Sequence, residues 1–113
     1  MSKDDYHVLV YRILVYLYDR LKKGLNPSQE DLNAIALNAE VNERYWHYVL
    51  KSLMDYGFIE GAARIDVDNT YERIVGMQNA QITPRGIEYL TDNAFMEKAK
   101  RFLKDAKDII PFI

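Results

Sequence analysis

Hydrophobic residues recur with helical spacing near the start of the chain. From Tyr6 to Lys23 they form one stripe, and Gly24 follows at a position that commonly ends a helix. This stripe consists of Tyr6, Val10, Ile13, Leu14, Leu17 and Leu21. A second stripe on roughly the opposite side consists of Val8, Tyr11, Val15 and Tyr18. Because a helix that is apolar on two sides is not an ordinary surface helix, we expect another element of this chain, or a partner subunit, to cover the second stripe.

Two further helices are predicted between Ser28 and Gly57. Ser28 has the spacing of a capping residue to Asp31 and begins a short helix through about Leu37. Asn42 can cap a third helix that continues to Tyr56 and is closed by Gly57. The inward residues are Leu32, Ile35 and Ala36 in the second helix and Trp46, Val49, Leu50 and Leu53 in the third. The outward residues of the third helix are Arg44, His47, Tyr48 and Lys51.

A hairpin and two more helices are predicted after Gly57. Phe58 and Ile59 open an extended region, Ile65 and Val67 alternate with polar neighbours as in a half-buried strand, and Asp68 and Asn69 form a turn. A second strand runs from about Glu72 to Ile82 with an interruption at Gly76, and Thr83 with Pro84 begins a helix that carries Ile87, Tyr89 and Leu90.

A last amphipathic helix is predicted from about Ala94 to Asp108, before Pro111. Its apolar stripe consists of Phe95, Ala99, Phe102, Leu103, Ala106 and Ile110. We expect Phe95, Ala99, Phe102 and Leu103 to pack on the second stripe of the first helix, although pairing with a second copy of the chain would bury the same surface. Attachment to a membrane is disfavoured because Glu97, Asp105 and Asp108 dilute the basic face of this helix.

This order of elements predicts an α+β, mostly helical chain with a winged helix-turn-helix, that is, three helices and a β-hairpin wing, followed by two additional C-terminal helices. Residues 1–93 form the predicted winged-helix domain, and residues 94–113 the C-terminal amphipathic helix. The segment from Leu50 to Ile59 resembles the end of the recognition helix in winged-helix regulators. The segment from Ile82 to Leu90 resembles the return from their wing to the next helix.

The whole chain also carries a more specific set of motifs. These are Lys3-Asp4-Asp5-Tyr6 with Tyr11 and Arg12, the helix that begins at Thr83-Pro84, and Phe95-Met96 with Ala99-Lys100-Arg101-Phe102-Leu103. In these segments the chain resembles the YjcQ-like family of small bacterial and prophage proteins. The resemblance implies a winged-helix fold and a bacterial or prophage setting, and it brings no established activity.

Composition narrows the classes of function. The 113 residues suit one domain, and the absence of cysteine suits a reducing compartment, so we expect a cytoplasmic protein. Charged residues near the start, among them Arg12, Asp19 and Arg20, fit neither a signal peptide nor a membrane span. Residues 1–93 carry 10 basic against 14 acidic residues, and residues 94–113 carry 5 against 3. The basic face expected of a nucleic-acid binder is therefore missing from the body of the chain.

Two binding hypotheses follow for the outward face of the third helix. As a DNA-binding regulator or accessory protein, the chain would contact double-stranded DNA through Arg44, His47, Tyr48 and Lys51 of the helix and Arg64 and Arg73 of the wing. Against this, Glu43 and Asp55 offset the helix charges, and Asp66, Asp68 and Glu72 lie between the wing arginines. The alternative is a protein-interaction module, with a protein partner or a homodimer, that has kept the winged-helix scaffold without DNA binding.

Enzymatic and metal chemistry are not expected. His7 and His47 are on different helices without a cluster of carboxylates. The run Asp66-x-Asp68-x-Thr70 lacks the glycine and the glutamate that a calcium loop needs. There is also no glycine-rich phosphate loop and no serine nucleophile motif. We therefore expect a non-enzymatic protein without cofactor, metal or small-molecule ligand.

Overall fold

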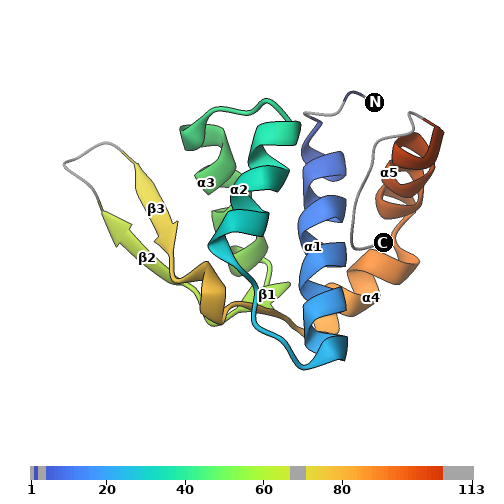
Figure 1. Ribbon diagram of the computed structural model, residues 1–113. Coiled ribbons are helices and arrows are strands. Elements are labelled where there is room, and N and C mark those ends of the chain that lie inside the picture. The colour runs from blue at the N-terminus through green and yellow to red at the C-terminus, as the bar shows by residue number, and fades with distance from the viewer. Residues whose placement is uncertain (1, 3–4, 67–70, 106–113) are drawn as a thin grey trace.

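The computed structural model describes residues 2, 5–66 and 71–105 (Figure 1). Five helices, four short strands and one 3₁₀ helix, η1, lie in this part of the chain. In order they are α1 (Tyr6–Lys23), α2 (Gln29–Asn38), α3 (Glu43–Asp55), β1 (Ile59–Glu60), β2 (Ala63–Asp66), β3 (Glu72–Val75), η1 (Met77–Asn79), β4 (Gln81–Ile82), α4 (Pro84–Asp92) and α5 (Ala94–Asp105). The order confirms the predicted α+β, mostly helical winged-helix fold with two helices after the wing.

The predicted first residues of three helices are confirmed by capping hydrogen bonds. Ser28 Oγ accepts a hydrogen bond from the Asp31 amide at 3.0 Å, Asn42 Oδ1 accepts one from Tyr45 at 2.8 Å, and Thr83 Oγ1 accepts one from Gly86 at 3.0 Å. Each bond satisfies an amide that has no partner within its helix. Local sequence therefore determines where α2, α3 and α4 begin.

The wing differs from the predicted pair of strands in two ways. The second strand is not continuous, because Gly76 has a left-handed φ of 74° and the chain then forms η1 before β4. Ile65 is 44% exposed and not half-buried, since β2 lies on the side of the hairpin away from the helices (Figure 1). Only Ile74 of β3 is buried from this β2–β3 pair. The predicted turn at Asp68–Asn69, with Val67, is outside the described residues.

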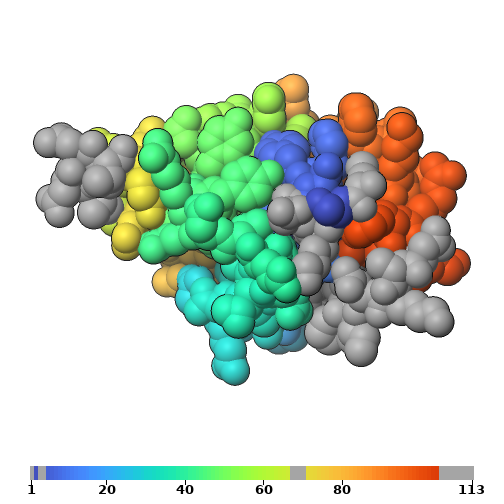
Figure 2. Space-filling view, turned by 90° about the horizontal axis from the view of Figure 1, so that it is seen from above, coloured from blue at the N-terminus to red at the C-terminus, as the bar shows by residue number. Residues whose placement is uncertain are grey.

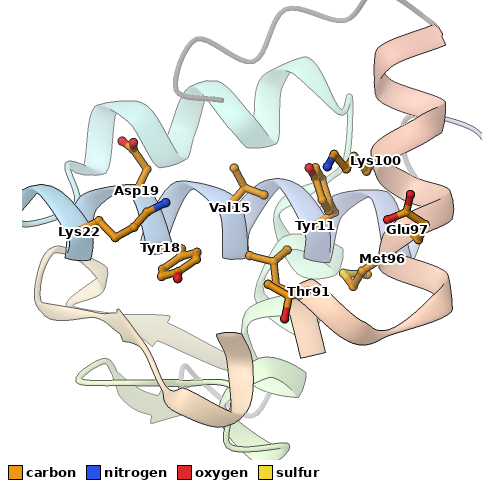
Figure 3. Close-up of a pocket in the computed structure, with 10 residues that line it drawn as sticks. Tyr11, Val15, Tyr18, Asp19, Lys22, Thr91, Met96, Glu97 and Lys100 are labelled. Atoms are coloured by element: carbon orange, nitrogen blue, oxygen red, sulfur yellow. The ribbon is translucent and has the colours of Figure 1, made fainter. Parts of the chain in front are cut away.

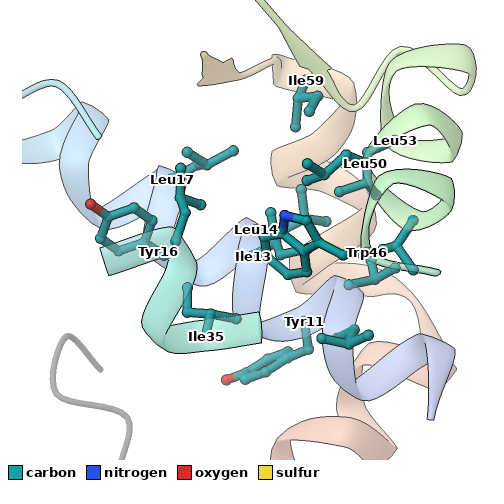
Figure 4. Close-up of a cluster of buried hydrophobic side chains, with 14 of the residues drawn as sticks. Tyr11, Ile13, Leu14, Tyr16, Leu17, Ile35, Trp46, Leu50, Leu53 and Ile59 are labelled. Carbon is teal, nitrogen blue, oxygen red and sulfur yellow. The ribbon is translucent and has the colours of Figure 1, made fainter. Parts of the chain in front are cut away.

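α1 runs through the middle of the core, and most residues of both its apolar stripes are buried or partly buried (Figure 4). Leu21, predicted on the first stripe, is instead 41% exposed, because it lies in the last turn of α1. One side packs with α3, where Trp46, Val49, Leu50 and Leu53 are buried as predicted. The other side packs against α5, through Met96, Ala99 and Leu103. The chain itself thus covers Val8 and Tyr11 of the second stripe and leaves Val15 and Tyr18 partly buried.

Phe95 does not take the core position that the helical pattern assigned to it. Its ring is 48% exposed and stacks on the imidazole of His7 at 4.2 Å between centroids, while the next residue, Met96, is fully buried. The reason is the rotation of α5, which turns positions 96, 99 and 103 toward α1. Phe102 is partly buried, and Ala106 and Ile110 of the predicted stripe lie outside the described residues.

The junction between α3 and α4 depends on a glycine. A Cβ on Gly86 would lie 2.2 Å from the carbonyl oxygen of Phe58, so no larger residue fits there without moving α4. Thr83 Oγ1 donates to the Gly57 carbonyl at 2.6 Å, and the Thr83 amide donates to that of Phe58 at 2.9 Å. These contacts hold the start of α4 against the end of α3 and set Tyr89 beside Phe58.

Candidate functional site on α3 and the wing

Three of the basic residues predicted to contact DNA form ion pairs with acidic residues of α3. Asp55 accepts hydrogen bonds from Lys51, at 3.3 Å, and from Arg64 of β2. At the other end of α3, Glu43 pairs with Arg73 of β3 at 3.0 Å. The hydrogen bond from Arg64, followed by that from Lys51, lowers the pKa of Asp55, so this carboxylate stays charged at neutral pH.

The α3 and wing face is consequently close to neutral. In residues 43–66 and 71–75 the bases are Arg44, Lys51, Arg64 and Arg73, and the acids are Glu43, Asp55, Glu60, Asp66 and Glu72. Among these bases, in the part of the chain that the structure describes, Arg44 alone has no acidic partner. It is exposed and lies 5.8 Å from the centre of the Tyr71 ring. A phosphate backbone would therefore meet five acids and four bases on this face.

His47 is a structural residue and not an outward one. It is half-buried, and its Nδ1 accepts a hydrogen bond from the Ile74 amide of β3 at 3.0 Å. Its Nε2 lies 3.9 Å from Glu43. Burial lowers the pKa of His47 below its ordinary value of 6.5, with Glu43 opposing and Arg73 adding to this shift. The neutral ring that can accept from Ile74 is therefore favoured, and His47 fastens the wing to α3.

Beside this face lies a set of aromatic side chains that we call the aromatic band: Tyr6, Tyr45, Tyr48, Tyr56, Phe58 and Tyr89. Tyr45 and Tyr48 stack at 6.2 Å, Phe58 lies 5.6 Å from Tyr56, and Phe58 stacks on Tyr89 at 4.4 Å. The Tyr6 hydroxyl bonds Ser52 Oγ of α3 at 2.7 Å and lies near enough to Tyr48, Tyr56 and Tyr89 to interact with them electrostatically. Tyr6 is the first residue of α1, whose start lies between α3 and α5 (Figure 2).

The aromatic band is partly open to solvent. Tyr48 is 61% and Tyr56 is 57% exposed. Burial, and the closeness of the other hydroxyls, raise the pKa of Tyr6 and of Tyr89, so these groups are uncharged at neutral pH. Of this band, sequence reasoning singled out Tyr48 as a contact residue. For the other members of the band, the only indication in the sequence was the presence of nine tyrosines in the chain.

Two grooves flank α3 and α1. The first, the α2/α3 groove, has a volume of about 450 Å³ and lies between α2, α3 and the stretch from β3 to η1. Its apolar lining consists of Leu32, Ala36, Leu37, Val41, Trp46, Leu50, Ile74 and Met77. The second, of about 590 Å³, lies between α1, α4 and α5, with Tyr11, Val15 and Tyr18 of α1 facing Met96, Glu97 and Lys100 of α5 (Figure 3). Asp19 and Lys22 complete its rim, which therefore mixes both signs of charge.

In the described ranges, no three His, Asp or Glu side chains gather where they could hold a metal ion. None of the helices in those ranges combines the length and the apolar content needed to cross a bilayer.

A family model named YjcQ protein matches residues 11–109. The chain belongs to the YjcQ family. This agrees with the resemblance carried by the Thr83-Pro84 helix and the Ala99–Leu103 segment. No curated protein and no solved structure gives a significant match. Membership in the YjcQ family therefore does not by itself assign an activity to the chain.

Proposed function

We propose that this member of the YjcQ family is a non-enzymatic protein-binding module that contacts its partner through the aromatic band on a winged-helix scaffold. The observation that carries the proposal is the exposure of Tyr48 and Tyr56, at 61% and 57%, next to a face whose charges nearly cancel. Tyrosine is enriched at the centres of protein interfaces, where a rigid ring supplies contact area and its hydroxyl supplies a hydrogen bond.

DNA binding is the second candidate. It is favoured by the winged-helix order and by Arg44, which is exposed near the start of α3 without an acidic partner in the described residues. It is disfavoured by the ion pairs that occupy Lys51, Arg64 and Arg73. Exposed ion pairs of this kind are weak, so they alone would not prevent Lys51, Arg64 and Arg73 from binding a phosphate. Their acids stay on the face, however, and repel it.

A salt titration distinguishes the two candidates. A labelled pool of random duplexes is mixed with the protein at ~50 mM salt, and anisotropy is followed as salt is raised. We expect no salt-dependent binding. Micromolar binding that falls steeply with salt, and that weakens in Arg44→Ala, would instead assign the protein to the DNA-binding class.

The aromatic band is tested in the cell that naturally produces the protein. A cross-linked partner is isolated with the wild type, with Tyr48→Ala/Tyr56→Ala and with Leu25→Ala. The last variant is a matched control, because Leu25 is 50% exposed and lies beyond the far end of α1. We expect the partner to be lost only with the tyrosine variant. Equal recovery with all three proteins contradicts the role of the band.

A further inference from the structure

α5 presents a row of basic side chains to solvent. We call Lys98, Arg101 and Lys104 the α5 strip, and all three are exposed. Among the side chains that the structure describes, no ion pair involves a residue of α5. The helix is also basic as a whole, because its sequence holds four bases, Lys98, Lys100, Arg101 and Lys104, and two acids, Glu97 and Asp105. The α5 strip therefore differs from the α3 and wing face, where three of the four bases are paired.

The α5 strip lies next to the aromatic band. Tyr6 of the band meets His7 edge to face, with 5.3 Å between ring centres, and His7 stacks on Phe95 of α5 at 4.2 Å. Phe95 is 48% exposed, and Lys98 Nζ lies 5.8 Å from the centre of its ring. Because α1 begins between α3 and α5 (Figure 2), this row of contacts joins the band to the first of the strip's bases.

The two adjoining surfaces ask for different chemistry in one ligand. The aromatic band is uncharged and partly open, so it suits apolar residues. Lys98 and Lys104 are six positions apart in α5, which is about 9 Å at the rise of an α-helix. An extended chain advances about 3.3 Å per residue, so a run of about three or four acidic residues spans the α5 strip.

A nucleic acid does not match this division of charge. It carries a phosphate on every nucleotide, and the aromatic band lies beside the α3 and wing face, which holds five acids and four bases. Stacking of a base on Phe95 is also restricted, since His7 covers one face of its ring at 4.2 Å. A protein segment, in contrast, can place apolar residues on the band and confine its charge to the α5 end.

We propose that the α5 strip binds a short acidic run of the partner protein, and that apolar residues next to this run contact the aromatic band. This inference rests on the proposed function, because the band supplies the adjoining contact, and it adds the charge that the partner must carry there. Complementary charge of this kind selects the partner and speeds its encounter with the protein.

The probe is a fluorescein-labelled synthetic peptide with three leucines in one half and six glutamates in the other. Its counterpart has lysines in place of the glutamates, and binding of both to the full chain is followed by anisotropy. We expect the glutamate peptide to bind at least about tenfold more tightly than the lysine peptide, and to bind less tightly as salt is raised. Equal binding of the two peptides, or no binding of the glutamate peptide at ~1 mM, would overturn the proposal.

Charge reversal locates the acidic run. Lys98→Glu/Arg101→Glu changes exposed residues, so it should fold normally and weaken the glutamate peptide by about tenfold or more. Lys22→Glu/Lys23→Glu makes the same change of charge in the last turn of α1 and is the matched control, which should bind nearly as the wild type does. Unchanged binding by the α5 variant, or an equal loss in both variants, overturns the proposal. A labelled oligothymidylate that binds more tightly than the peptide, and that is lost in the α5 variant, would make a nucleic acid the occupant and overturn it too.

The tyrosine variant separates this inference from the proposed function. Tyr48→Ala/Tyr56→Ala should weaken the glutamate peptide as well, because its leucines lose their contacts. Weakening by the tyrosine variant alone would leave the aromatic band as a binding surface and overturn the role of the α5 strip. Weakening by the α5 variant alone would support the acidic run and contradict the role of the aromatic band.

Discussion

At the scale of single residues, Trp46 determines how the outer face of α3 is oriented. It is 7% exposed and shares its stripe with Val49, Leu50 and Leu53 (Figure 4). Trp46→Ala should lower the free energy of unfolding by ~3–5 kcal/mol, because it removes a large buried ring and leaves a cavity. Urea unfolding measures this, with Tyr48→Ala on the same helix as an exposed control that should change stability by no more than about 0.5 kcal/mol. Equal denaturation midpoints for Trp46→Ala and the wild type would contradict the orientation of α3.

At the scale of elements, the wing depends on the protonation state of His47. Since burial lowers the folded pKa of His47 below the 6.5 of the unfolded chain, the unfolded chain binds the proton more tightly. The stability that the His47–Ile74 bond contributes is present above pH 6.5 and is lost as pH falls through the folded pKa. Stability should therefore fall as the pH is lowered from neutral through 6.5 and then through the lower folded pKa of His47. The fall should be smaller in His47→Gln, which keeps His7, when both are measured by urea unfolding.

The same bond gives a local measurement. After correction for the intrinsic pH dependence of hydrogen exchange, the Ile74 amide should be less protected at about pH 5 than at neutral pH. Protection of Ile74 that does not respond to pH would show that His47 does not fasten the wing.

At the scale of the whole molecule, α5 completes the core around α1. Met96, Ala99 and Leu103 are buried on it, and full burial of a side chain such as methionine or leucine is worth ~1.5–3 kcal/mol before the ordering of α5 is subtracted. A chain that ends at Asn93 should unfold at markedly lower urea concentration or aggregate. A chain that ends at Asp105 keeps α5, so the difference between the two truncations isolates its contribution. A shorter chain that is as stable as the longer one would contradict it.

The helices could be predicted from the sequence because the interactions that define them are local in the chain. Ser28, Asn42 and Thr83 each cap a helix by bonding an amide three residues later, so these caps can be predicted without knowledge of the fold. The apolar stripes of α1 and α3 follow the same local period. The wing was predicted less well: the break at Gly76 and the exposure of Ile65 depend on which strand packs against the helices, which no local pattern contains.

The functional surfaces were decided by the tertiary structure. The six predicted contact residues do gather on α3 and the wing, but Asp55 and Glu43 offset the charges of Lys51, Arg64 and Arg73. His47 bonds the backbone of β3. The aromatic band brings together residues of α1, α3, the segment between α3 and β1, and α4. Its first and last members, Tyr6 and Tyr89, are 83 positions apart in the sequence. Sequence alone thus determined the helices, their caps and the residue types that α3 presents. Packing between distant elements determined which of those residues are neutralised, buried or left open, because ion pairs and exposure arise from contacts that are long-range in the chain.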